Sequence, residues 1–154
     1  MTVETSKSKT PKAVLQQVLA PAKPKKILII GGGYAGFYTA WKLEKLLKKG
    51  EAEVTLVDPL PYMTYQPFLP EVAAGSIEAR HTVVSHRQHL KKTTLVSGRM
   101  TQVVHKTKKA TIEVEGGKTI TLSYDQIVMT AGAVTRTFPI EGIAENAIGM
   151  KTIE

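Results

Sequence analysis

The chain has 154 residues and a mass of 16.8 kDa, the size of one ordinary domain or of part of a larger one. Hydrophobic residues make up 42% and charged residues 22% of it, so wholesale disorder is excluded. The chain contains no cysteine, which excludes a disulfide scaffold, a cysteine-based zinc site, an iron–sulfur site and a thiol nucleophile within it. The net charge of +8 favours an anionic partner, namely nucleic acid, an acidic membrane face or a phosphate ligand.

Most of this positive charge lies in the N-terminal segment. Residues 1–26 hold six lysines and one glutamate, a net charge of +5, whereas residues 27–154 have a net charge of +3. Because prolines interrupt the segment, we expect residues 1–25 to form a flexible basic arm, either a solvated tail or a docking peptide for a membrane surface or a partner. The arm has no aromatic residue to accompany its lysines, so we do not expect nucleic-acid binding.

No signal peptide or transmembrane helix is expected in this chain. The longest uncharged run near the N-terminus, residues 27–41, has 15 residues and includes four glycines. A spanning helix needs about 20 apolar residues. The apolar core before the glycines, residues 27–30, is also shorter than the core of a signal peptide.

The next segments follow the order strand, glycine turn, helix, strand. Residues 25–30 end in an apolar run typical of a buried parallel strand, and the sequence GGGYAG at residues 31–36 fits G-x-G-x-x-G. Residues 37–49 have apolar side chains near the helical period, and Gly50 suits the end of that helix. Residues 53–58 predict a second strand with an aspartate at its end, 22 residues after the last glycine of the motif. This is the spacing of a nucleotide-binding βαβ unit.

Each motif residue has a role in that unit. Gly31 permits the tight turn, Gly33 lets the backbone approach a pyrophosphate, and Gly36 lets the helix pack close to the strand. The pyrophosphate would lie at the positive end of the helix. Asp58 would accept hydrogen bonds from ribose hydroxyls and repel a 2′-phosphate, which favours FAD or NAD over NADP. The alternative is a glycine turn that binds no ligand.

The chain then departs from a simple repeat of strand and helix. We expect a proline-bearing loop over residues 59–70, a short helix over 71–75 and another helix over 82–90. Residues 93–98 predict a third strand.

Alternating segments predict a small antiparallel meander after that strand. They cover residues 99–105, 110–115 and 118–123, and Gly116-Gly117 predicts a two-residue hairpin between the last two. An apolar strand led in by Tyr124-Asp125 follows and ends at Ala131-Gly132-Ala133. The predicted fold is therefore an α/β Rossmann-like FAD/NAD(P)-binding domain, a parallel sheet with helices and an inserted antiparallel β-meander.

These features together resemble the two-dinucleotide-binding-domain flavoproteins. The glycine turn, Asp58, the meander and the segment from Tyr124 to Ala133 carry that resemblance. Residues 62–75, with Gln66-Pro67 and the sequence EVAAG at 71–75, look more narrowly like type II NADH dehydrogenase in its actinobacterial form. That family is the non-proton-pumping NADH:quinone oxidoreductase. The resemblance covers residues 26–154, which it identifies as the N-terminal part of an FAD-binding domain that is incomplete at its C-terminus.

The resemblance implies an FAD-dependent enzyme of the respiratory chain. Electrons pass from NADH through FAD to a membrane quinone such as menaquinone, and NADH binds a second domain outside this chain. The family lies on the cytoplasmic face of the cell membrane through a C-terminal region that is also outside the chain, and it forms homodimers. The chain alone is then expected to be inactive and to retain FAD weakly or not at all.

The resemblance also implies which residues contact FAD. Those at the pyrophosphate are Gly31, Gly33, Tyr34, Ala35 and Gly36. Asp58 holds the adenosine ribose, where many relatives have glutamate. The backbone of Val103 or Val104 meets the adenine, Ala131 and Gly132 lie beside the pyrophosphate or ribityl chain, and Gln66 with Pro67 approaches the flavin ring.

No residue of the chain is predicted to be a general acid, base, nucleophile or metal ligand. The four histidines, at positions 81, 86, 89 and 105, are interpreted as surface residues. Disulfide reductases of the same class carry a cysteine pair after the first helix, so the lack of cysteine excludes that chemistry here. Two alternatives remain: a non-catalytic dinucleotide-binding module, and another FAD-dependent oxidoreductase such as a sulfide:quinone oxidoreductase.

Overall fold

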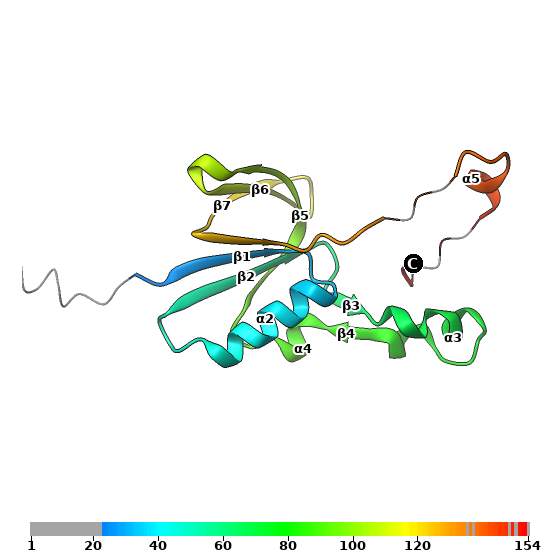
Figure 1. Ribbon diagram of the computed structural model, residues 1–154, viewed down its shortest axis with the longest axis horizontal. Coiled ribbons are helices and arrows are strands. Elements are labelled where there is room, and N and C mark those ends of the chain that lie inside the picture. Colours follow the sequence, from blue (N-terminus) through cyan, green and yellow to red (C-terminus); the bar gives the residue numbers. More distant parts are fainter. Residues whose placement is uncertain (1–22, 135, 137, 148, 150, 154) are drawn as a thin grey trace, which may run out of the picture.

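The computed structural model describes residues 23–134, 136, 138–147, 149 and 151–153. Within them, six strands form one sheet in the order β7-β6-β5-β2-β1-β8 (Figure 1). The predicted basic arm lies outside the described residues up to residue 22, and Lys25 already begins the first strand.

The parallel half of the sheet is built around β1 (Lys25–Ile30). This strand pairs with β2 (Ala52–Asp58) on one side and with β8 (Gln126–Met129) on the other, and β2 pairs with the first residues of β5 (Thr94–Val104). All three pairings are parallel. The strands predicted at residues 25–30 and 53–58 are therefore confirmed.

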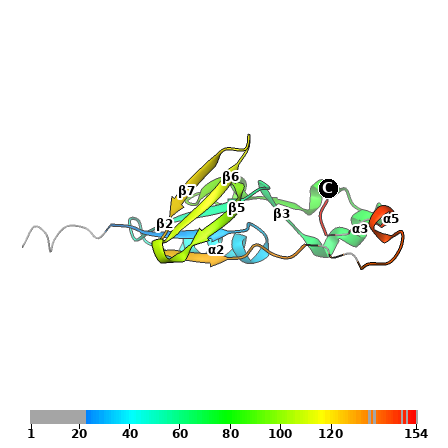
Figure 2. The same ribbon diagram turned by 90° about the horizontal axis from the view of Figure 1, so that it is seen from above.

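The antiparallel half is the meander of β5, β6 (Lys109–Val114) and β7 (Thr119–Ser123). A short 3-10 helix, η3 (His105–Thr107), joins β5 to β6. The hairpin at Gly116-Gly117 is present, but its turn is longer than the predicted two residues, because the Val114 N–H donates to the Lys118 carbonyl and the strands stop on either side. Figure 2 shows the meander strands crossing the parallel strands at an angle.

One strand replaces two predicted ones in β5. Its residues Thr94–Ser97 pair in parallel with β2, and from Gly98 onward it pairs antiparallel with β6. A Cβ at Gly98 would lie 2.6 Å from the Glu113 carbonyl oxygen, so this glycine allows the two backbones to approach. The prediction of separate strands at 93–98 and 99–105 was wrong, because β5 continues through Gly98 without interruption.

The parallel sheet lies between two layers, α2 (Tyr34–Leu46) on one face and the meander on the other (Figure 1). Side chains alternate along β1, so Ile27 and Ile29 pack with Phe37 and Ala40 of α2. The intervening Leu28 and Ile30 pack on the opposite face. Their partners there are Ala110 and Ile112 of β6 and Tyr124, which follows β7. Both layers therefore meet on the same strand.

The helix α2 begins and ends earlier than predicted. It starts at Tyr34, inside the glycine motif, because Gly33 serves as its N-cap. Its C-cap Leu47 is extended, and a turn from Lys48 to Glu51 follows, in which Gly50 has a φ of +83°. Residues 48 and 49 thus lie beyond the helix.

The segment between β2 and β5 contains more structure than the predicted loop. A second, two-stranded antiparallel sheet joins β3 (Tyr62–Thr64) to β4 (Val83–Ser85). Between them lie η1 (Gln66–Phe68), α3 (Leu69–Ala73) and η2 (Ala79–Thr82), and α4 (His86–His89) follows β4. The helix predicted at 82–90 was wrong in its first half, because Thr82 ends η2 and the β-branched Val83 and Val84 belong to β4. The chain after β8 leaves the sheet and reaches α5 (Ile143–Asn146), as Figure 1 shows.

Candidate functional site

The glycine turn connects β1 to α2 at the carboxyl edge of the parallel strands. Gly31 has a φ of +98°, and its N–H donates to the Val57 carbonyl at 2.8 Å. A Cβ at Gly31 would overlap the Thr130 carbonyl oxygen, and a Cβ at Gly36 would overlap the Gly31 carbonyl oxygen. The packing of the turn against the end of β8 and against α2 therefore requires both glycines.

Gly33 differs from these two glycines because the described part of the chain does not require it for packing. A Cβ at Gly33 would meet nothing within 4 Å, and the residue is exposed with a φ of −68°. Among the described residues, no side chain caps the start of α2, and its first turn contains no acidic residue. The first N–H groups of a helix have no partner within the helix, and they carry its positive dipole end. An anion can therefore approach the helix at Gly33, Tyr34 and Ala35, all of which are exposed.

Asp58 lies at the end of β2, next to this turn. One oxygen of its half-buried carboxylate, Oδ2, accepts a hydrogen bond from the Gly32 N–H, and Oδ1 accepts one from the Leu60 N–H at 2.8 Å. Each carboxylate oxygen has a second lone pair, so the group can still accept hydrogen bonds from a ligand. The carboxylate both fixes the turn and remains available to hydroxyl groups.

His86 is a part of the site that the sequence interpretation missed. It is 2% exposed, its Nε2 lies 2.8 Å from the Gly32 carbonyl oxygen, and its ring stacks on Phe37 with centroids 6.0 Å apart. The interpretation of His86 as a surface residue was wrong. It is separated from Gly32 by 54 positions, so only the tertiary fold brings the two together and no local sequence pattern shows the contact.

Thr130 joins the end of β8 to the same turn. Its hydroxyl donates to the carbonyls of Ile30 and Gly31, at 2.8 and 3.0 Å. Ala131 and Gly132 follow it directly and are exposed. A Cβ added to Gly31 would lie 3.0 Å from the Ala131 Cα. The structure therefore brings Ala131 beside the glycine turn, and Gly132, with a φ of +71°, continues from there.

The segment containing Gln66 and Pro67 lies close to the first turn of α2. Both residues are exposed at the start of η1, and the preceding Tyr65 ring lies 5.9 Å from the Tyr34 ring. The pKa of Tyr34 lies above its ordinary value. Desolvation is the largest cause, and the neighbouring Tyr65 and Tyr38 hydroxyls raise the pKa further. Tyr34 therefore stays protonated at neutral pH and can donate a hydrogen bond.

Val103 and Val104 are not brought to the turn. They pair with Ala110 and Lys109 of β6, whereas Ser97 is the β5 residue that pairs with Asp58. Val103 is the sixth residue after Ser97, roughly 20 Å further along the strand. Contact of these valines with an adenine stays a prediction, and on β5 the positions next to Asp58 are Ser97 and Gly98.

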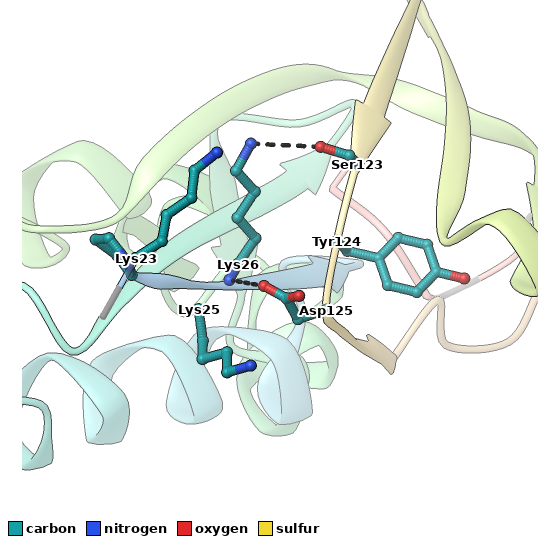
Figure 3. A pocket seen from close by; sticks show the side chains of 7 residues that line it. Lys23, Lys25, Lys26, Ser123, Tyr124 and Asp125 are labelled. Atoms are coloured by element: carbon teal, nitrogen blue, oxygen red, sulfur yellow. Dashed lines mark hydrogen bonds between the residues drawn. The ribbon is translucent and has the colours of Figure 1, made fainter. Parts of the chain in front are cut away.

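A separate pocket of about 280 Å³ lies at the opposite, amino edge of β1 (Figure 3). The Lys26 N–H donates to Asp125 Oδ2 at 2.7 Å, and Lys26 Nζ donates to Ser123 Oγ at 3.3 Å. Lys23 and Lys25 also line it. These contacts tie the start of β1 to the turn before β8, far along the strand from the glycines.

The described part of the chain presents neither a cluster of metal-ligating side chains nor a helix able to span a membrane. Among the described residues, no three His, Cys, Asp or Glu side chains gather in a way that could hold a metal ion. In the same part of the chain, no helix has the length and apolar character needed to cross a membrane.

Comparison with known proteins gives a consistent result. The sequence profile of the pyridine nucleotide-disulphide oxidoreductase family matches residues 25–154. A type II NADH:quinone oxidoreductase from Staphylococcus aureus is 31% identical over 131 residues, which are 84% of this chain and 31% of that protein. The chain thus spans about a third of the length of the curated relatives it matches.

Solved structures share the fold. The NDH2 of Plasmodium falciparum in complex with NADH superposes with a TM-score of 0.70 at 27% identity, over 79% of this chain and 25% of that chain. The sulfide:quinone oxidoreductase of Aquifex aeolicus superposes with a TM-score of 0.65 at 25% identity, over 79% and 27% of the two chains. The predicted Rossmann-like α/β fold is confirmed by these similarities and by the sheet itself.

Proposed function

Since the chain belongs to the pyridine nucleotide-disulphide oxidoreductase family, we propose that it binds FAD at the glycine turn and serves an NADH:quinone oxidoreductase of the type II class. NADH oxidation and quinone reduction are proposed for a polypeptide of the relatives' full length, at the cytoplasmic face of a membrane and as a homodimer. The segment described here would supply the pyrophosphate and adenosine-ribose contacts.

The position of Gly33 is the observation that most directly supports FAD binding at this turn. It stands at the uncapped N-terminus of α2, is exposed, and has no neighbour that would collide with a Cβ. In the same turn, Gly31 and Gly36 are explained by packing within the chain. A pyrophosphate that approaches the backbone at Gly33 explains the third glycine, and the partial positive charge of the helix end favours its negative charge.

The other residues of the site fit an FAD molecule laid across this edge of the sheet. Asp58 presents free lone pairs two strands away from β8, so it can hold the ribose on one side of the turn. Ala131 and Gly132 lie on the other side, where the pyrophosphate or the ribityl chain would pass. Tyr34 can donate a hydrogen bond, and Gln66, which follows the Tyr65 ring that lies 5.9 Å from the Tyr34 ring, is proposed to approach the flavin.

FAD, when bound, supplies the hydride acceptance and electron delivery of this enzyme class. The chain's own residues bind and orient it: the N-terminus of α2 neutralises charge, and Asp58 disfavours a ligand with a 2′-phosphate. No described residue is proposed to act as an acid or base.

Titration of the ¹⁵N-labelled 154-residue chain with FAD, followed by NMR, tests the binding step. We expect the amides of residues 33–36 to shift first and a Gly33→Val substitution to abolish the shifts while leaving the spectrum folded. Purification of a full-length product tests the larger proposal, through flavin absorbance and NADH oxidation with a quinone acceptor. A colourless, inactive full-length protein would overturn the enzyme assignment, and its retention of dinucleotide binding would instead support a non-catalytic module.

A further inference from the structure

The successive peptide groups of the glycine turn differ in which of their carbonyl and N–H groups have hydrogen-bond partners within the described fold. The first of them, between Ile30 and Gly31, is fixed on both sides. Its carbonyl accepts hydrogen bonds from the N–H and the hydroxyl of Thr130, both at 2.8 Å, and its N–H donates to Val57. Both the carbonyl and the N–H of this peptide group therefore have hydrogen-bond partners within the fold.

The second peptide group, between Gly31 and Gly32, is fixed in the same way. Its carbonyl accepts from the Thr130 hydroxyl at 3.0 Å, and its N–H donates to Asp58. Neither of these groups is therefore left to bind a ligand.

The third peptide group, between Gly32 and Gly33, is held on one side alone. His86 Nε2 lies 2.8 Å from its carbonyl oxygen, whereas the Gly33 N–H has no acceptor within the described part of the chain. The carbonyl and the N–H of a trans peptide point in opposite directions, and the described chain contains no cis peptide. Because the carbonyl points inward to a buried ring, the N–H points outward, to the exposed start of α2.

The surroundings of His86 hold it in this position. Its ring stacks on Phe37, and its backbone N–H donates to the Pro61 carbonyl at 3.0 Å. A carbonyl oxygen only accepts hydrogen bonds, so Nε2 carries the hydrogen. A Cβ on Gly32 would overlap the His86 ring, which explains a glycine at a position where the G-x-G-x-x-G pattern requires none.

We propose that His86 is a positioning residue, which turns the Gly32–Gly33 peptide so that the Gly33 N–H faces the pyrophosphate of the bound dinucleotide. The identity of the ligand rests on the proposed function, but the orientation of the N–H does not. His86 itself is too deeply buried to touch the ligand and acts through the backbone.

Three variants of the full 154-residue chain separate this role from simple packing. His86→Phe keeps a ring to stack on Phe37 and removes the donor, and His86→Gln restores an N–H near the position of Nε2. His89→Phe is the matched control, since His89 lies on the same short helix and contacts Phe37 edge-on but is exposed.

The first readout needs no ligand. ¹⁵N relaxation should give the Gly33 N–H an order parameter near the rigid value of about 0.85 in the wild type, His86→Gln and His89→Phe, and a value below about 0.6 in His86→Phe. An unchanged order parameter at Gly33 in a folded His86→Phe variant would overturn the proposal.

The second readout is the affinity for FAD in the same NMR titration. We expect about a tenfold loss in His86→Phe, the equivalent of one weakened charge-assisted hydrogen bond, and recovery to within about threefold in His86→Gln. A mobile Gly33 with unchanged FAD affinity would overturn the link to the ligand. If the 154-residue chain binds FAD too weakly to titrate, the same variants are compared in the full-length product by their flavin content. A wild-type full-length product that holds no flavin means that the proposed function fails, and the order parameter alone then decides whether His86 fixes the peptide.

Discussion

Polar contacts hold both ends of β1, but the two ends differ in whether a hydrogen-bond donor is left without a partner in the described part of the chain. At the amino end, Lys26 uses its backbone N–H on Asp125 and its ammonium on Ser123. At the carboxyl end, Thr130, Asp58 and His86 hold three successive peptides, and the contacts stop at the Gly33 N–H. Hydrogen-bonding groups that are all paired with each other stabilise the fold. An N–H group that is held in a fixed orientation without an acceptor can instead bind a ligand.

The largest effect that tests this contrast is expected for Gly36→Ala. The added methyl group would overlap the Gly31 carbonyl and lie 2.8 Å from the Thr130 hydroxyl, so the turn and α2 must separate. We expect a loss of about 3 kcal/mol in the free energy of unfolding, measured by urea denaturation. Gly33→Ala is the control at the open position, and its stability should change by about 0.5 kcal/mol. Equal losses in the two variants would contradict the distinction between packing and ligand glycines.

Asp58→Asn should have the next largest effect. The amide can accept a hydrogen bond from Gly32 or from Leu60, but its NH₂ group then faces the other N–H donor. We expect a loss of about 2 kcal/mol in stability, measured by urea denaturation, and weaker FAD binding in the NMR titration, because the amide accepts fewer hydrogen bonds from the ribose hydroxyls. Asp125→Asn, which removes the equivalent charge at the amino end, should leave FAD binding unchanged.

Glu44 provides a test at a site away from both ends of β1. Its carboxylate accepts hydrogen bonds from the N–H groups of Lys91, Lys92 and Thr93 and from the Thr93 hydroxyl. Burial raises the pKa of Glu44, but these hydrogen bonds outweigh it and the net pKa lies below the ordinary value.

A lowered pKa in the folded state means that this stabilisation is fully present above the pKa of glutamate in the unfolded chain and is lost as the pH falls through the folded value. Glu44→Gln should therefore cost about 1–2 kcal/mol at pH 7 and less under acid conditions. Urea denaturation at several pH values measures this, with Glu53→Gln, an exposed residue on β2, as the control. A loss that grows with acidity would contradict the sign.

The smallest effect is expected for Asp125→Ala at the amino end. It removes the acceptor of the Lys26 N–H in an exposed position, so we expect a loss of about 1 kcal/mol in stability. FAD binding should not change, because the glycine turn lies at the other end of the strand. Weaker FAD binding in a fully folded Asp125→Ala variant would show that the two ends are coupled.

Local patterns were enough to predict β1, the glycine turn, β2 and its terminal Asp58, since each depends on residues adjacent in the sequence. The division of β5 into two predicted strands failed because the role of Gly98 is set by the backbone of Glu113, which strand pairing brings close. The burial of His86 and the hydrogen bonds of Thr130 were missed for the same reason: their partners lie 54 and about 100 positions away. Contacts of this range follow from the order of strands in the sheet, which no single segment encodes.

The alternation of side chains along β1 has a consequence for insertions and deletions. Its six residues separate the Lys26–Asp125 contact from Gly31, and each successive side chain belongs to a different layer. One added residue would exchange the faces of every side chain beyond it and shift the turn by about 3.3 Å along the strand. We therefore expect β1 to tolerate no insertion or deletion of a single residue, whereas the loops on either side of the sheet can change in length.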